Sequence, residues 1–311
     1  MRIGKRFVPA PVGPSYANPA LQLERDCPIS VPEFPHNDTA ALRAAADGGA
    51  LCTIVEIDGS FSRRLGAQLC VKSDGSVVGS MADGCLEAAL VDAARQGGPA
   101  RVLHFGGAGD AMDLRLPCGS RIAICVDPAP DRALLSRAVA RLNERRTARI
   151  TLPCDKGARD YIPELRIVAV GTGPELSAFE RQAATFGAAT VALRPHGEDG
   201  TGLSLGQAPQ LPLDPWTAVV VLFHDHEWER AILPWALRGP AFYVGAQGGR
   251  AAREERALFL ESCELEPGAM ARMHGPVGLI AQARDPAVLA LSVLAEIVAE
   301  YERIEKRAGP A

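Results

Sequence analysis

The fold of the second half of the chain is decided by the stretch ELRIVAVGTGPELSAFERQAATFGAATVALRP, residues 164–195. An apolar run is followed by a glycine turn, a segment with helical spacing and a second apolar run. The segments TAVVVLF, EWERAILPWALRG and AFYVG then repeat this alternation of strand and helix. Because strands that alternate with helices form parallel sheets, residues 165–311 are predicted to form a doubly wound α/β domain.

The first half of the chain has a mixed pattern. Residues 1–37 are rich in proline and lack periodicity, so they are predicted to form an irregular arm. Residues 38–154 contain a short alanine-rich helix, several strands and a turn at Asp74-Gly75, which predicts a mixed α/β domain with hairpin elements. Residues 155–164 are polar and contain proline and glycine, so they are predicted to link the two domains.

Charge and cysteine content argue against several classes of protein. The 311 residues carry 33 basic and 37 acidic side chains, and this balance gives no electrostatic case for binding nucleic acid or an anionic membrane. The eight cysteines include no Cys-x-x-Cys motif, which argues against a zinc ribbon. The N-terminus lacks the apolar run of a signal peptide, and no apolar stretch is long enough to span a membrane. We therefore expect a cytoplasmic protein with reduced thiols.

Cys85 stands at the predicted start of a helix, in the stretch GSMADGCLEAAL, residues 79–90. Asp83 or Gly84 is suited to cap this helix, and Glu87 is an acidic residue placed for its first turn. A thiol at the positive end of a helix dipole loses its proton more easily, which favours a reactive cysteine. The alternative is a small buried hydrophobic residue, because most intracellular cysteines are structural.

The glycine turn that contains Gly171 and Gly173 is suited to a phosphate at the N-terminus of the following helix. Leu176 replaces the third glycine of the dinucleotide-binding motif, and Leu193-Arg194 stands where an NAD site has an acidic residue for the ribose. These departures argue against the binding of NAD(P) at this turn. A nicotinamide-dependent oxidoreductase remains the alternative function. A scaffold protein with a vestigial, empty cleft is a third possibility.

Two further segments of the first domain carry candidate residues. In GSFSRRLGAQ, residues 59–68, Arg63 and Arg64 stand beside flexible glycines such as Gly66, and guanidinium groups offer forked donors to phosphate. The alternative is a solvated basic loop. Cys118 lies in a Pro-Cys-Gly turn, where it is either a second functional thiol or a buried turn residue.

Histidines provide the last candidates. His224, Asp225 and His226 follow the strand TAVVVLF, and ligands of parallel sheets bind at the carboxyl ends of strands. They are suited to ligate a metal or to orient a phosphate, whereas the alternative is a solvated loop in which Asp225 caps the next helix. His274 is a lone histidine, for which packing is the simpler interpretation.

The motif segments occur in the order GSFSRRLGAQ, DGSVVGS, DGCLE, LPCGSRI, VGTG, LFHDHE, PAFYVGAQGGR and MHGPVGL. This series resembles the XdhC/CoxI family, the accessory proteins of xanthine dehydrogenase and other molybdenum hydroxylases. The resemblance covers nearly everything after about residue 38 and implies an N-terminal XdhC/CoxI domain followed by a Rossmann-like domain. It further implies a chaperone, more than a catalyst, that binds molybdenum cofactor, favours its sulfurated form and delivers it to an apo molybdenum hydroxylase.

The resemblance also implies particular partners and site residues. The cofactor is molybdopterin, with a dinucleotide form left open, and it is bound transiently. A cysteine desulfurase is a further candidate partner, and the apolar face of the C-terminal helix, 288–301, indicates a homodimer. Molybdenum accepts soft sulfur ligands, so Cys85 and Cys118 are the candidate metal contacts. No residue is expected to be catalytic, and the candidate cofactor-binding residues are Arg63, Arg64, Gly66, Cys85, Cys118, Gly171, Gly173, His224, Asp225 and His226.

Overall fold

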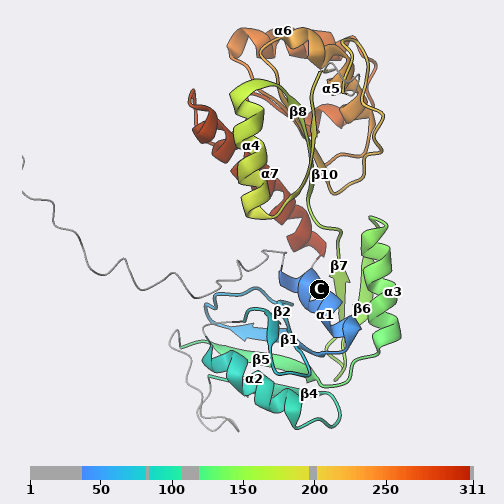
Figure 1. The fold of residues 1–311 in the computed structure, drawn as a ribbon, viewed down its shortest axis with the longest axis vertical. Helices are drawn as coiled ribbons and strands as arrows, with labels where there is room; N and C mark the ends of the chain where they lie inside the picture. Colours follow the sequence, from blue (N-terminus) through green and yellow to red (C-terminus); the bar gives the residue numbers. More distant parts are fainter. Residues whose placement is uncertain (1–36, 82–83, 107–118, 196–201, 309–311) are drawn as a thin grey trace, which may run out of the picture. The chain divides into compact units, whose positions relative to one another are not determined.

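The computed structural model describes residues 37–81, 84–106, 119–195 and 202–308. Within these ranges the chain forms a five-stranded antiparallel sheet, a five-stranded parallel sheet and a two-stranded antiparallel sheet (Figure 1). The predicted irregular arm lies outside the described residues, apart from Asn37. None of the described helices is long and apolar enough to cross a membrane.

The antiparallel sheet has the strand order β3-β2-β1-β5-β4 and is covered by helices on both faces. Leu86 and Leu90 of α2 pack in one buried cluster with Ile54, whereas Leu42 of α1 packs with Cys70 in the other. The predicted turn at Asp74-Gly75 joins β2 to β3. The elements of this part are α1 (Asn37–Asp47), β1 (Ala50–Asp58), β2 (Gln68–Val71), β3 (Val77–Gly79), α2 (Cys85–Arg95), β4 (Arg101–Phe105), β5 (Arg121–Asp127) and α3 (Arg132–Asn143).

The parallel sheet has the strand order β12-β11-β10-β8-β9, which confirms the predicted Rossmann-like architecture (Figure 1). Every residue of β10 is buried because helices cover both faces of the sheet. Val220 packs with α4 and α7 in one cluster, whereas Val219 and Val221 pack with α5 and α6 in the other. The elements are β8 (Arg166–Gly171), α4 (Gly173–Phe186), β9 (Ala189–Leu193), β10 (Thr217–Leu222), α5 (Glu229–Arg238), β11 (Tyr243–Ala246), α6 (Arg250–Glu261), β12 (Met273–His274) and α7 (Pro286–Ala308).

The stretch predicted as a linker, 155–164, differs from that prediction. Its central residues form strand β7 (Ala158–Tyr161), which pairs antiparallel with β6 (Ala148–Thr151). Tyr161 is buried in the cluster that contains α1 and α3. The sequence misleads here because two of the four residues of β7 are charged, and one of them, Arg159, is buried in an ion pair.

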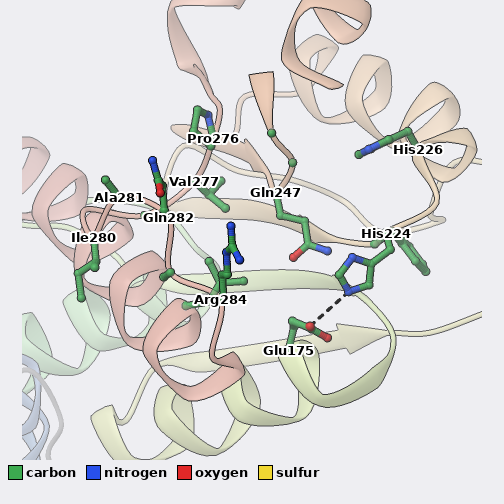
Figure 2. A pocket seen from close by; sticks show the side chains of 16 residues that line it. Glu175, His224, His226, Gln247, Pro276, Val277, Ile280, Ala281, Gln282 and Arg284 are labelled. Carbon is green, nitrogen blue, oxygen red and sulfur yellow. Dashed lines mark hydrogen bonds and ion pairs between the residues drawn. The ribbon is translucent and has the colours of Figure 1, made fainter. Parts of the chain in front are cut away.

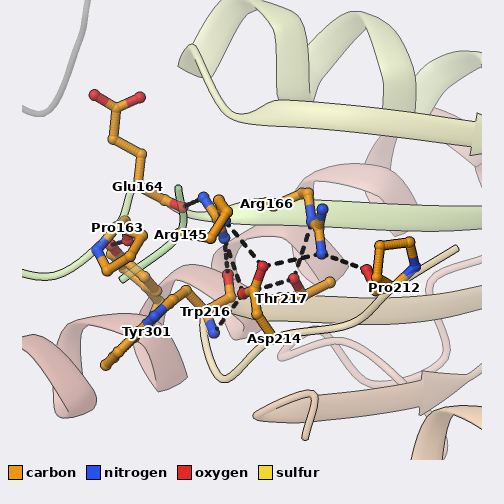
Figure 3. A network of polar contacts seen from close by, with 9 residues as sticks. All are labelled: Arg145, Pro163, Glu164, Arg166, Pro212, Asp214, Trp216, Thr217 and Tyr301. Atoms are coloured by element: carbon orange, nitrogen blue, oxygen red, sulfur yellow. Dashed lines mark hydrogen bonds and ion pairs between the residues drawn. The ribbon is translucent and has the colours of Figure 1, made fainter. Parts of the chain in front are cut away.

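A polar network around Asp214 holds the first residues of β8 to the loop before β10 (Figure 3). Arg145 donates to both carboxylate oxygens of Asp214, at 2.9 and 3.0 Å, and to the carbonyl of Glu164 at 2.6 Å. Arg166, the first residue of β8, lies 3.0 Å from the same carboxylate. Burial opposes ionisation of Asp214, but the bonds from Arg145 and the backbone of Trp216 outweigh it and lower its pKa.

A buried carboxylate, Asp38 of α1, connects several elements of the first sheet. Its Oδ2 accepts hydrogen bonds from Arg159 at 2.6 Å and from Arg64 at 2.9 Å, and its Oδ1 accepts the backbone N–H of Gln68 at 2.9 Å. Gln68 in turn accepts a hydrogen bond from Tyr161 at 2.9 Å. Burial alone would raise the pKa of Asp38, but the two guanidinium groups outweigh it and hold that pKa below its usual value.

The apolar face of α7 is largely used inside its own domain. Val293, Ile297 and Tyr301 are buried, and Tyr301 donates to the carbonyl of Pro163 at 2.7 Å. Leu291 is 56% exposed. The apolar pattern of residues 288–301 is therefore explained mainly by packing on the parallel sheet, and it carries little argument for a homodimer.

We predict that Asp38→Asn lowers the free energy of unfolding at pH 7 by about 3 kcal/mol, because it leaves buried Arg159 without its counter-charge. The pKa of Asp38 is lower in the folded protein, so its ion pairs stabilise the fold above the unfolded pKa of about 3.9. This contribution disappears as the pH falls through the folded pKa. Urea unfolding between pH 3 and pH 7 should therefore show wild type and variant converging in acid.

The matched control is Asp92→Asn, which changes an exposed carboxylate on α2. Its effect on unfolding should stay within about 0.5 kcal/mol at every pH. Equal stability of Asp38→Asn and wild type at pH 7 would refute the structural role of Asp38.

Candidate functional site

Cys85 is the first residue of α2, and its side chain is exposed. Gly84 precedes it with a φ of 95°, and its N–H donates to Glu87 Oε2 at 2.8 Å. The other oxygen of Glu87 accepts the N–H of Met81 at 2.9 Å. Glu87 therefore organises the turn that presents the thiol, as the sequence predicted for an acidic residue in the first turn. Asp83, the other predicted cap, lies outside the described residues.

Arg63 ties the preceding basic loop to this turn. Its Nε donates to the carbonyl of Ser80 at 3.0 Å, and its Nη2 donates to the hydroxyl of Ser80 at 3.0 Å. A third bond goes from Nη1 to the carbonyl of Ser62 at 3.2 Å. The guanidinium of Arg63 thus positions the backbone a few residues before Cys85.

The same loop is bonded to the start of β5. The hydroxyl of Ser120 donates to the carbonyl of Ser60. Gly106, at the end of β4, approaches so closely that a Cβ there would lie 2.1 Å from the carbonyl oxygen of Ser120. The loop 59–67 is therefore linked to the segments that flank both cysteine motifs. Cys118 itself lies outside the described residues, so its pairing with Cys85 at a metal remains a prediction.

Arg64 and Gly66 serve the framework of this loop. Arg64 is bonded to buried Asp38, and its side chain remains 39% exposed. Gly66 donates its N–H to the carbonyl of Ile54 at 2.8 Å and has a φ of 81°, which is the left-handed region that favours glycine. These contacts of Arg64 and Gly66 lead to the core of the domain, whereas those of Arg63 lead to the turn before Cys85.

The other cysteines of the first sheet are poor sulfur ligands because they are buried. Burial raises the pKa of Cys70 to about 11 and that of Cys125 to about 12, and it raises the pKa of Cys52 further. The sulfur of Cys125 lies 3.9 Å from that of Cys154, which is exposed. Among the described thiols of this part, Cys85 and Cys154 are the exposed ones.

A carboxylate, that of Glu175, lies beside the glycine turn of the parallel sheet. Gly171 packs against β10, where a Cβ would lie 2.6 Å from the carbonyl oxygen of Leu222. Gly173 begins α4 with a φ of 75°, and a Cβ there would lie 3.4 Å from Oε2 of Glu175. The carboxylate of Glu175 thus lies at the helix N-terminus, where a dinucleotide site has its phosphates. Leu176 is fully buried at the position of the missing third glycine.

The three residues of the His-Asp-His motif have separate contacts. His224 Nε2 lies 3.2 Å from Oε1 of Glu175, and His226 Nδ1 lies 2.8 Å from Oε1 of Glu229. Asp225 accepts the N–H of Glu227 at 3.0 Å and so caps the short helix His226–Trp228. The described residues contain no group of three or more His, Cys, Asp or Glu side chains that could hold a metal ion.

A buried ion pair that the sequence analysis missed supports the loop after β11. Arg256 of α6 donates to both oxygens of Glu229, at 2.6 and 2.8 Å, and to the carbonyl of Gln247 at 2.7 Å. Arg256 and Glu229 are 5% and 4% exposed. Both lie in segments rich in charged residues, where the pattern does not distinguish a buried charge from a solvated one.

A cavity of about 580 Å³ opens at the carboxyl ends of the parallel strands (Figure 2). Its walls come from α4, the loops after β10 and β11, and residues 276–289. Figure 2 shows the side chains of Glu175, His224 and Gln247 directed toward one space, which the side chain of Arg284 also approaches. Gln247 was not predicted, because a glutamine in the glycine-rich stretch GAQGGR carries no pattern of its own. His274 lies outside this lining and stacks on Tyr243, as expected for a packed residue.

Known proteins similar to this chain agree with the fold and the motifs. The model of the XdhC and CoxI family matches residues 42–106, and the model of the XdhC Rossmann domain matches residues 167–297. The molybdenum cofactor insertion chaperone PaoD of Escherichia coli (strain K12) is 30% identical over 274 residues, which cover 80% of this chain and 82% of PaoD. The crystal structure of a xanthine dehydrogenase from Bacillus halodurans superposes with a TM-score of 0.67 at 18% identity. The superposed region covers 88% of this chain and 98% of the Bacillus halodurans chain. At this identity, the similarity supports the fold alone. From its two matched domains and its similarity to PaoD, we conclude that the chain belongs to the XdhC and CoxI family.

Proposed function

We propose that this protein binds molybdenum cofactor as cargo and delivers it, in sulfurated form, to an apo molybdenum hydroxylase. The observation that carries the proposal is the exposed thiol of Cys85 at the N-terminus of α2, in a chain similar to an insertion chaperone. Molybdenum accepts soft sulfur ligands, and the exposed sulfur of Cys85 is accessible to a bound cofactor. The role is that of a chaperone, and a cysteine desulfurase is the proposed source of the terminal sulfur.

The alternative, an oxidoreductase that uses NAD(P), has less support from the same geometry. Glu175 places a carboxylate beside the glycine turn, where it would repel the phosphates of a dinucleotide. Arg194, at the position of the ribose-binding acid, is paired with Glu180. Calorimetry with NAD and NADP tests this alternative: tight binding together with hydride transfer would replace the chaperone proposal.

The proposal is tested by transfer of the cargo. Purified protein loaded with molybdenum cofactor is mixed with an apo hydroxylase, and the activity of the hydroxylase is followed over time. We expect activation that is faster or more complete than with free cofactor. Activation that is identical with and without the protein would contradict the proposed delivery.

We predict that Cys85→Ser impairs cofactor retention while the free energy of unfolding changes by less than about 0.5 kcal/mol, because the side chain is exposed. Serine keeps the size of the side chain but removes the soft sulfur. The readouts are pterin fluorescence after oxidation of the purified protein and its thermal unfolding. Cys154→Ser, which changes another exposed cysteine, is the control and should retain the cofactor. If Cys85→Ser retains as much cofactor as wild type and Cys154→Ser do, Cys85 does not have the proposed role.

We also predict that the two neighbouring arginines separate into different roles. Arg63→Ala removes the hydrogen bonds to Ser80, so it should reduce cofactor retention by loosening the turn before Cys85. Arg64→Ala removes a partly exposed ion pair with Asp38 and should cost about 1 kcal/mol of stability. Retention and urea unfolding are measured on both variants. The assignment is wrong if Arg64→Ala loses cofactor at unchanged stability while Arg63→Ala behaves as wild type.

A further inference from the structure

Two buried polar atoms without a hydrogen-bond partner belong to residues that line the cavity of the parallel sheet. They are Oε2 of Glu175 and Nε2 of Gln247. Gln247 is 7% exposed, and Figure 2 shows its amide directed into the same space as the carboxylate of Glu175. Buried polar groups are nearly always hydrogen-bonded, because an unsatisfied one costs free energy. An acceptor and a donor that lack partners at the same cavity therefore indicate a ligand that offers both a hydrogen-bond donor and a hydrogen-bond acceptor.

The charge of this pair limits the chemistry of that ligand. Glu175 lies at the N-terminus of α4, where its carboxylate takes the favourable position that a phosphate would otherwise occupy. A phosphate in the same position would meet a negative charge. The part of the ligand that contacts the carboxylate of Glu175 must therefore offer hydrogen-bond donors, such as N–H groups, rather than anionic oxygens.

A carboxylate beside an amide donor is complementary to a 2-amino-4-oxopyrimidine ring. This ring has an exocyclic amine next to a ring N–H, and a carboxylate can accept both through its two oxygens. Oε1 of Glu175 already contacts His224 but, as a carboxylate oxygen, has a second lone pair. The amide N–H of Gln247 can then donate to the ring carbonyl or to a ring nitrogen.

The apolar part of the remaining lining suits a planar ring. Phe223, Pro276, Val277 and Leu289 supply apolar surface around the polar pair. The volume of about 580 Å³ lies within the usual range for small-molecule sites. The buried ion pair of Arg256 and Glu229 holds the backbone carbonyl of Gln247, so the backbone that carries this donor is fixed before a ligand arrives.

We propose that this cavity binds a 2-amino-4-oxopyrimidine ring, with Glu175 accepting its two adjacent N–H groups and Gln247 donating to its acceptor edge. The proposal rests on the proposed function, since the pterin of the cargo contains this ring. The guanine base of a dinucleotide form contains it as well. Glu175 and Gln247 are thus assigned as the residues that recognise the organic part of the cargo.

The test is a fluorescence titration of the full-length protein with neopterin, guanosine, cytidine and adenosine. Wild type should bind neopterin and guanosine, and it should prefer both of them to cytidine and adenosine. The tighter of the two identifies the source of the ring, pterin or guanine. Equal binding of all four compounds, or no binding of neopterin and guanosine, overturns the proposal.

Variants then connect this binding to the named residues. Glu175→Gln replaces an acceptor oxygen by a donor and should weaken binding of the preferred ring at least about tenfold, as expected when a bidentate pair is lost. Gln247→Leu should also weaken it. The control Glu180→Gln changes another carboxylate of α4, one that is paired with Arg194, and should bind as wild type. Thermal unfolding is measured on each variant, and wild-type binding by folded Glu175→Gln and Gln247→Leu overturns the assignment.

Hydroxylase activation by the same variants separates this inference from the proposed function. If wild type and Glu175→Gln activate the apo hydroxylase equally, the cavity is not the cargo site but the chaperone role stands. If wild type activates nothing and still binds neopterin through Glu175, the proposed function fails and the ring subsite remains.

Discussion

The buried carboxylate of Asp38 is the interaction on which the first domain depends. One oxygen holds Arg159 of β7 and Arg64 of the loop 59–67, and the other holds the backbone of β2 through Gln68. Arg64 therefore attaches the middle of the loop 59–67 to the centre of its domain. The neighbouring residue, Arg63, bonds to Ser80 in the turn before Cys85. An ion pair in the core and a short chain of hydrogen bonds thus connect the centre of the domain to Ser80, five residues before the exposed thiol.

Much of the fold follows from the sequence. The alternation of apolar runs and helical segments after residue 164 predicts the parallel sheet, and the turn at Asp74-Gly75 predicts the hairpin of β2 and β3. Strand β7 could not be predicted in this way, because buried Arg159 takes its partner from α1, far away in the sequence. The role of Arg64 was hidden for the same reason: its partner, Asp38, precedes it by 26 residues.

The candidate site was only partly predictable. The motif around Cys85 could be identified because capping has local rules, and the structure has the expected acidic residue in the first turn. Glu175 and Gln247 follow different strands and have no motif in common, so only the folded sheet brings them to one cavity. The two sites belong to different domains, one built on α2 and one on the parallel sheet, and each has its own variants and control. Loss of cofactor in one set alone would show which of them holds the cargo.

The most direct measurement is the cofactor content of wild-type protein purified from cells that synthesise molybdenum cofactor. Molybdenum is determined by elemental mass spectrometry, and the pterin is determined by its fluorescence after oxidation. A cofactor chaperone should carry both, in similar molar amounts, and should release both when an apo hydroxylase is added. Folded protein that carries neither molybdenum nor pterin, and acquires neither when free cofactor is supplied, would contradict the account.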